Sequence, residues 1–190
     1  MKALFIIAPV DFRDEEYFVP KQILEENRVE ITTASTTKIS TSKFGKQVNV
    51  DVLLENADSD YDLLLFVGGH GARDYFDNPL ALNLARKFLE EGKFVTAICI
   101  GPAILAKAGV LKGKKATVWA SEKNREGIEI LKENGAEYLD QEVVIDGRII
   151  TANGPEVAEE FGKKILEVGA GLGSFTKIYF KDNLDITLSE

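Results

Sequence analysis

The chain has 190 residues and a formal net charge of −8 at neutral pH, and it contains one cysteine and one histidine. This length suits a single α/β domain with a sizeable core. Because an acidic chain lacks a basic stripe that would neutralise phosphates, we expect neither a nucleic acid nor a membrane surface as its partner. One cysteine cannot form an internal disulfide, and no apolar run approaches the roughly 18 residues that cross a bilayer. We therefore expect a cytoplasmic protein that binds a small molecule or another protein.

Strand-like and helix-like segments alternate along the chain, which is typical of a mostly parallel sheet covered by helices on both faces. The strands expected in this sheet are residues 3–8, 30–34, 62–67, 94–98 and 116–119. The expected helices are residues 16–27, 79–91, 102–108, 123–134 and 155–168.

Two segments depart from this alternation. Residues 38–50 are rich in β-branched side chains and contain Gly45, which predicts a small hairpin beside the main sheet. Residues 143–150 place two apolar arms around an Asp-Gly pair, a strong hairpin signal. Residues 169–190 form a C-terminal extension, in which alternating apolar residues predict either a terminal hairpin or a frayed tail.

Cys99 lies where the apolar run 94–98 ends and a helix opens with Pro102 in its first turn. Such a strand-to-helix turn presents a side chain at the carboxyl edge of a sheet, close to backbone N–H groups and the positive end of the helix. These surroundings favour a thiolate, so we predict that Cys99 is a nucleophile. The alternative is that Cys99 is a small buried hydrophobic residue, the commoner fate of a lone cysteine.

Two further loops reach the same edge, where ligands bind in open α/β sheets. Gly68-Gly69 follows the strand 62–67, and paired glycines let backbone N–H groups approach a reacting oxygen. Gly69 and the N–H of Ile100 could therefore form an oxyanion hole, although a tight turn is the simpler explanation of two glycines.

Glu16 lies in the loop and helix that follow the first strand. In a helix from this position, Glu16 shares one face with Val19 and Ile23, which directs its carboxyl group along an apolar stripe. A charged Glu16 would oppose a Cys99 thiolate, whereas a protonated one could donate a hydrogen bond to it. The alternative is a solvated glutamate in the first helical turn, where the helix dipole favours it.

These motifs together resemble the ThiJ/PfpI superfamily, which includes the Parkinson-associated deglycase-like proteins and the PfpI-type peptidases. The resemblance covers residues 1–168, the expected domain. It implies a flavodoxin-like three-layer sandwich that forms a homodimer or, in PfpI-type members, a hexamer. It also implies Cys99 as the nucleophile, Glu16 as the carboxyl group at its sulfur, and Gly69 and Ile100 as oxyanion donors. The matching features are Glu16 four residues before Pro20, Gly68-Gly69, the run Ala-Ile-Cys-Ile-Gly-Pro at 97–102, and the run Ile-Ile-Thr-Ala-Asn-Gly-Pro at 149–155.

One departure from the family pattern bears on the chemistry. PfpI-type peptidases have a histidine directly after the nucleophile, whereas this chain has Ile100, which cannot shuttle a proton. His70 is the only histidine and could approach the sulfur, or it could simply structure its loop. Asp74 resembles the acidic position that PfpI-type members contribute across a subunit interface, and Trp119 stands where relatives place a histidine or tyrosine over the pocket.

Three functions remain open. The favoured hypothesis is an oxidisable thiolate with glyoxalase or deglycase chemistry on small carbonyl compounds, in which Glu16 moves protons. The second is a sensor or chaperone-like oligomer without enzymatic activity, which responds to oxidation of Cys99. The third is a cysteine hydrolase acting on a peptide-like ligand, which Ile100 makes less favoured. One histidine and one cysteine give no metal-site spacing, and we expect no cofactor.

Overall fold

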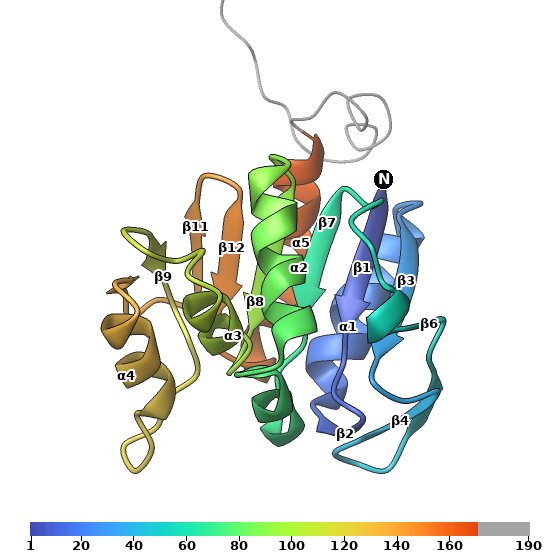
Figure 1. The fold of residues 1–190 in the computed structure, drawn as a ribbon, viewed down its shortest axis with the longest axis horizontal. Coiled ribbons are helices and arrows are strands. Elements are labelled where there is room, and N and C mark those ends of the chain that lie inside the picture. The colour runs from blue at the N-terminus through green and yellow to red at the C-terminus, as the bar shows by residue number, and fades with distance from the viewer. Residues whose placement is uncertain (171–190) are drawn as a thin grey trace, which may run out of the picture.

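The computed structural model describes residues 1–170, in which a seven-stranded sheet lies between two layers of helices (Figure 1). The strands are β1 (Lys2–Ile6), β2 (Val10–Phe12), β3 (Glu30–Ser35), β4 (Ile39–Ser42), β5 (Gln47–Asn49), β6 (Val52–Leu53), β7 (Leu63–Phe66), β8 (Phe94–Ile98), β9 (Lys115–Ala116), β10 (Glu137–Tyr138), β11 (Val143–Asp146) and β12 (Ile149–Ala152). The helices are α1 (Asp14–Glu26), α2 (Pro79–Glu90), α3 (Pro102–Lys107), α4 (Glu126–Glu133) and α5 (Ala158–Ala170), with 3₁₀ turns η1 (Leu54–Asn56), η2 (His70–Tyr75) and η3 (Pro155–Val157).

The main sheet has the strand order β11-β12-β8-β7-β1-β3-β6. All neighbouring pairs are parallel except β11 and β12, which form an antiparallel hairpin. Every residue of β7 and β8 is buried, as expected for central strands covered on both faces. The carboxyl ends of β1, β7 and β12 therefore meet at one edge, the lower edge in Figure 1.

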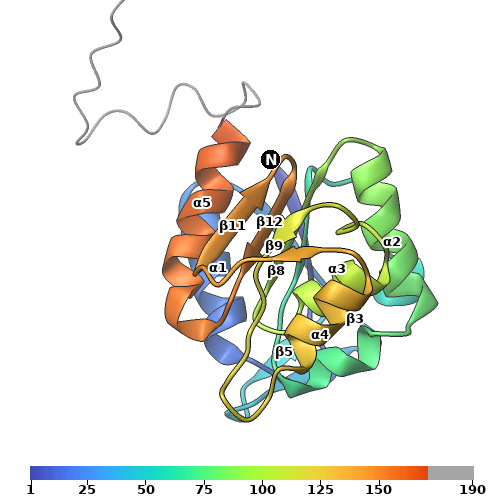
Figure 2. The same ribbon diagram turned by 90° about the vertical axis from the view of Figure 1, so that its left-hand side faces the viewer.

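Helices α1 and α5 cover one face of the sheet, and α2 and α3 cover the other (Figure 2). Helix α5 approaches α1 closely at Gly162, where an added Cβ would lie 3.0 Å from the Cδ1 of Ile23. This arrangement has the helices on both faces that the sequence pattern predicts, and it is the flavodoxin-like sandwich that the family resemblance implies. The predicted helices all occur, but α4 starts three residues later than expected, and a 3₁₀ turn replaces the start of the last helix.

The expected position of residues 116–119 in the main sheet is wrong. Lys115 and Ala116 pair with β10 in a separate two-stranded ladder. The free edge of β8 is instead occupied by β12, so residues 117–119 reach the sheet only through isolated hydrogen bonds, such as Thr117 N–H to Thr151 Oγ1 at 2.9 Å.

Both internal hairpins are confirmed. The Asp-Gly hairpin forms β11 and β12, and residues 38–50 form the antiparallel pair β4 and β5, to which β2 adds a third strand. The alternatives for the C-terminal extension concern residues 171–190, which lie outside the described part of the chain.

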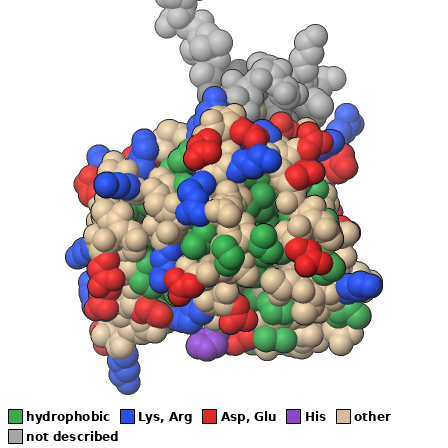
Figure 3. Space-filling view, in the orientation of Figure 1, with side chains coloured by type: hydrophobic (Ala, Val, Ile, Leu, Met, Phe, Trp, Pro, Cys, Tyr) green, Lys and Arg blue, Asp and Glu red, His purple; other side chains and the backbone are tan. Residues whose placement is uncertain are grey.

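Among residues 1–170, no helix is long and apolar enough to cross a membrane. Figure 3 shows acidic and basic side chains intermixed over the described residues of one face, and no basic stripe crosses that face.

Candidate active site

Cys99 occupies the turn between β8 and α3 in a left-handed backbone conformation, with φ of +61°. Non-glycine residues rarely adopt this conformation, and it occurs often at functional sites. Two backbone hydrogen bonds hold the turn: the Cys99 N–H donates to the carbonyl of Ala152 at 2.9 Å, and the Trp119 N–H donates to the Cys99 carbonyl at 2.8 Å. The sulfur is therefore presented from a turn fixed on both sides.

Glu16 lies on α1 next to Cys99 and is completely buried. Neither of its carboxyl oxygens makes a well-formed hydrogen bond to a described residue, and its polar neighbours are the Cys99 thiol and the Gly68 amide. Gly68 separates the two side chains so closely that an added Cβ would lie 2.5 Å from Glu16 Oε2 and 2.6 Å from Cys99 Cβ. The burial predicted for Glu16 from its helical face is thus observed.

Burial raises the pKa of Glu16 from 4.5 to about 8, because the site offers little solvation to a charged carboxylate. Hydrogen bonding to Cys99 and the positive charge of Arg13 offset only part of this effect. The Glu16 carboxyl group is therefore mostly protonated at neutral pH.

The pKa of the Cys99 thiol is raised well above its usual value, first by burial and then by repulsion from a charged Glu16. The sequence predicts the opposite direction, because it places the sulfur near backbone amides and a helix start but does not reveal its burial. The amides of Gly69 and Ile100 do lower the pKa, though by less. Because the two acids are coupled, they titrate as a pair, and repulsion within the pair is absent while either of them holds its proton.

The backbone N–H groups of Gly69 and Ile100 both donate toward the Cys99 sulfur. Gly69 has a φ of +96°, and an added Cβ would lie 2.4 Å from the carbonyl oxygen of Asp11. Glycine is therefore required there by both conformation and space. The Ile100 side chain is buried toward α4, with its Cδ1 only 3.1 Å from where a Cβ on Gly127 would lie.

These groups open into a pocket of about 320 Å³. Trp119 lines it, and so does His70, whose exposed ring accepts a hydrogen bond from Arg73 at its Nδ1, 3.3 Å away. Asp74 is exposed on η2 and does not line this pocket, so its expected role across a subunit interface stays a prediction. The pocket is lined by Arg13, Glu16, Lys43, Gly69, His70, Arg73, Cys99, Ile100, Trp119, Asn124, Pro155 and Glu156.

Sequence reasoning misses the basic side chains at this pocket. Arg13 and Arg73 come from the first two loops at the sheet edge, whereas Lys43 comes from the β4–β5 turn. The positions of the two arginines in loops at the sheet edge could have marked them as pocket residues. Nothing in the sequence distinguishes Lys43 from the solvated lysines around it.

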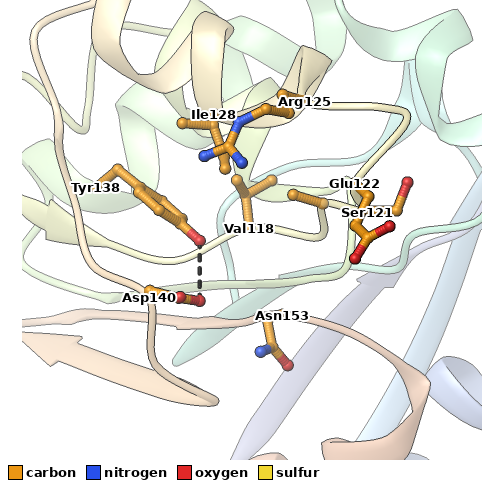
Figure 4. Close-up of a pocket in the computed structure, with 9 residues that line it drawn as sticks. Val118, Ser121, Glu122, Arg125, Ile128, Tyr138, Asp140 and Asn153 are labelled. Carbon is orange, nitrogen blue, oxygen red and sulfur yellow. Dashed lines mark hydrogen bonds between the residues drawn. The ribbon is translucent and has the colours of Figure 1, made fainter.

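A second pocket of about 270 Å³ shares the segment 118–125 with the first (Figure 4). Val118 and Ile128 form its apolar part, and the Tyr138 hydroxyl donates to Asp140 at 3.2 Å. It holds neither Cys99 nor Glu16, so we assign the chemistry to the first pocket. Among residues 1–170, no three histidine, cysteine, aspartate or glutamate side chains are grouped so that they could bind a metal ion.

Comparison with known proteins decides the family. The DJ-1/PfpI family model matches residues 1–168. The chain belongs to the DJ-1/PfpI family. It is 37% identical to the deglycase PfpI of Pyrococcus furiosus over 82% of this chain and 91% of that one. It is 30% identical to the glutathione-independent glyoxalase DJR-1.2 of Caenorhabditis elegans, over 89% of each chain. The crystal structure of a ThiJ/PfpI domain protein from Brachyspira murdochii superimposes with a TM-score of 0.84 at 29% identity, over 90% of this chain and 96% of that one.

Proposed function

We propose that this DJ-1/PfpI family protein is a cysteine-dependent enzyme that converts small 2-oxoaldehydes to 2-hydroxy acids without a cofactor. One observation carries the proposal: a buried, mostly protonated Glu16 carboxyl group lies beside the Cys99 sulfur, which two backbone amides also face. Relatives named as a deglycase and a glyoxalase support this class of carbonyl chemistry.

The reaction begins from the singly deprotonated pair, in which Glu16, the stronger acid of the two, has lost its proton. The Glu16 carboxylate takes the Cys99 proton, which places the proton on Glu16 and the charge on sulfur. The thiolate adds to the aldehyde carbon, and the carbonyl oxygen, held by the Gly69 and Ile100 amides, takes the proton of Glu16. The resulting Glu16 carboxylate removes the proton from the former aldehyde carbon, and a proton is returned to the neighbouring carbon. The hydroxyl proton on the first carbon passes to the oxygen of the second, which gives the thioester of a 2-hydroxy acid. Water then cleaves the thioester, which releases the 2-hydroxy acid and restores the thiol.

The test measures lactate release from methylglyoxal. Cys99→Ser should abolish turnover, and Glu16→Gln should lower kcat by about 100-fold because an amide cannot relay the proton. Glu26→Gln, which removes an exposed carboxyl group from the same helix, is the matched control and should retain full activity. Turnover that survives in Cys99→Ser would refute the proposal.

A second candidate function is an oxidation sensor. The protonated Glu16 beside the sulfur favours it, because a carboxyl O–H can donate a hydrogen bond to a cysteine sulfinate. Mild peroxide should add two oxygen atoms to Cys99 in the wild type, as read by mass spectrometry, and fewer in Glu16→Leu. An unmodified Cys99, under conditions that oxidise glutathione, would exclude this function.

The hydrolase hypothesis has the least support, because Ile100 is buried toward α4 and His70 is exposed and bonded to Arg73. A His70→Ala variant with undiminished peptidase activity would remove His70 as the replacement base.

A further inference from the structure

We propose that the Cys99 pocket selects carbonyl compounds that carry a carboxylate or phosphate group, and that Lys43 is the main recognition residue for this anion. The inference deepens the proposed function, on which its catalytic part rests. It follows from the charges that line the pocket of an otherwise acidic chain.

The β4–β5 turn holds Lys43 at the pocket by backbone contacts. The Lys43 N–H donates to the Phe12 carbonyl at 2.8 Å, and the next N–H, of Phe44, donates to the buried carboxylate of Asp14 at 3.1 Å. Lys43 lines the pocket and forms no ion pair with the described residues. The turn therefore fixes the backbone of Lys43 at the pocket, and its exposed side chain carries a charge that no described residue neutralises.

Two guanidinium groups add hydrogen-bond donors for an anion to the same lining. Arg13 is held by Glu15 at 2.7 Å and lies over the Phe44 ring at 5.2 Å. Arg73 is held by Glu126, with its Nε 3.0 Å from Oε2. Each guanidinium group is thus paired with a carboxylate, so the two arginines contribute hydrogen-bond donors to the lining and little net charge.

The opposing charges inside the pocket are few. Glu16 is mostly protonated below pH 8, which leaves Glu156 as the one charged carboxylate in the lining. Arg13 and Arg73 are each paired with a carboxylate outside the lining, so Lys43 is the cation there that no described residue neutralises. Because the chain as a whole carries a net charge of −8, a positive lining at the reactive sulfur is opposite to the overall charge. A positive cleft attracts an anionic substrate and raises its local concentration.

The first experiment tests anion recruitment without catalysis. Iodoacetate and iodoacetamide attack a thiol through the same displacement of iodide but differ in charge, so the ratio of their rates at Cys99 reports the local field. We expect this ratio to exceed that of glutathione, and to fall about fivefold in Lys43→Met. Lys46→Met removes the same charge from the same turn outside the pocket and should leave the ratio unchanged. A ratio equal to that of glutathione, or equal effects of the two variants, would overturn the proposal.

The second experiment measures kcat/KM for three 2-oxoaldehydes: a five-carbon compound with a terminal carboxylate, its neutral methyl ester, and a phosphate monoester of similar length. The kcat/KM for at least one of the two anionic compounds should exceed that for the ester by about fivefold. This difference should disappear in Lys43→Met and at high salt. The better of the carboxylate and phosphate probes identifies the preferred group. Equal values for all three would overturn the inference but leave the proposed function intact. Loss of all turnover with the alkylation preference retained would overturn the proposed function but keep the anion site.

Discussion

Glu16 shows how one buried acid links stability to pH. Its pKa of about 8 in the folded chain, against 4.5 for an exposed glutamate, means that the folded chain keeps a proton that the unfolded chain releases between these values. The contribution of this proton to stability is therefore complete below pH 4.5 and is lost as the pH rises to 8.

We predict that the free energy of unfolding falls across this interval by up to about 5 kcal/mol because of Glu16. Glu16→Gln should remove this component, so the difference between wild type and variant, measured by urea unfolding from pH 4.5 to 8.5, isolates it. Glu26→Gln, an exposed change on the same helix, should keep the full slope. A Glu16→Gln curve parallel to the wild type would contradict the raised pKa.

Gly68 sets the spacing of the two reacting side chains. In Gly68→Ala, the new Cβ would meet Glu16 Oε2 at 2.5 Å and Cys99 Cβ at 2.6 Å, so one of them must move. We expect a loss of about 2 kcal/mol in stability and a marked fall in Cys99 alkylation by iodoacetamide. Gly92→Ala has an unfavourable φ of +70° but meets no atom within 4 Å, so it should lower stability without changing alkylation. Unchanged alkylation in Gly68→Ala would show that the spacing is not critical.

At the scale of elements, Asp14 joins helix α1 to the β4–β5 turn. Its carboxylate accepts hydrogen bonds from the Ser42 hydroxyl at 2.7 Å and the Phe44 N–H at 3.1 Å. Asp14→Ala should lower stability by about 2 kcal/mol, because the buried Ser42 hydroxyl and the Phe44 N–H lose their acceptor. It should also reduce the preference for iodoacetate, because Lys43 would lose its fixed position. Ser42→Ala keeps the bond from the Phe44 N–H to Asp14, but it also removes the bond that the Lys46 N–H donates to Ser42 Oγ at 3.0 Å. It should therefore cost a similar amount of stability while keeping more of the iodoacetate preference, and a larger loss of that preference than in Asp14→Ala would contradict this role.

The elements themselves were largely predictable, because short, mostly apolar runs such as 63–66 and 94–98 are typical of buried strands in a parallel sheet. An apolar run does not say which strand it will pair with. Residues 116–119 were therefore assigned to the wrong ladder, since the distant strand β12 occupies the edge of β8. Cys99 and Glu16 could be predicted as site residues because a local pattern marks each of them: a strand-to-helix turn for Cys99 and a helical face for Glu16. Lys43 could not, because its place at the pocket depends on how the separate β4–β5 hairpin folds against the rest of the chain.

At the scale of the whole molecule, the expected homo-oligomer stays a prediction. Three of the five large hydrophobic side chains that are exposed in the described chain, Val10, Ile39 and Phe44, lie on or beside the three-stranded sheet β2-β4-β5. Such a group of apolar side chains is typical of a surface where protein copies meet.

Sedimentation should therefore give a mass of at least two copies of the 20.9 kDa chain. Ile39→Glu should shift it toward a monomer, because a charge would be buried in the interface. Leu80→Glu alters an equally apolar exposed side chain on α2 and should leave the mass unchanged. A wild type that sediments as a monomer at high concentration would refute the prediction.

The φ of +61° at Cys99 implies that stability and activity favour different residues at this position. In most backbone conformations a glycine makes a protein less stable than an alanine does, but a left-handed conformation reverses that order. The free energy of unfolding of Cys99→Gly, measured in urea, should therefore exceed that of Cys99→Ala by about 1 kcal/mol. The backbone at the elbow thus favours a residue that cannot react. Selection for stability alone would drive the chain toward an inert protein, and its chemistry persists only where the loss of the sulfur is penalised.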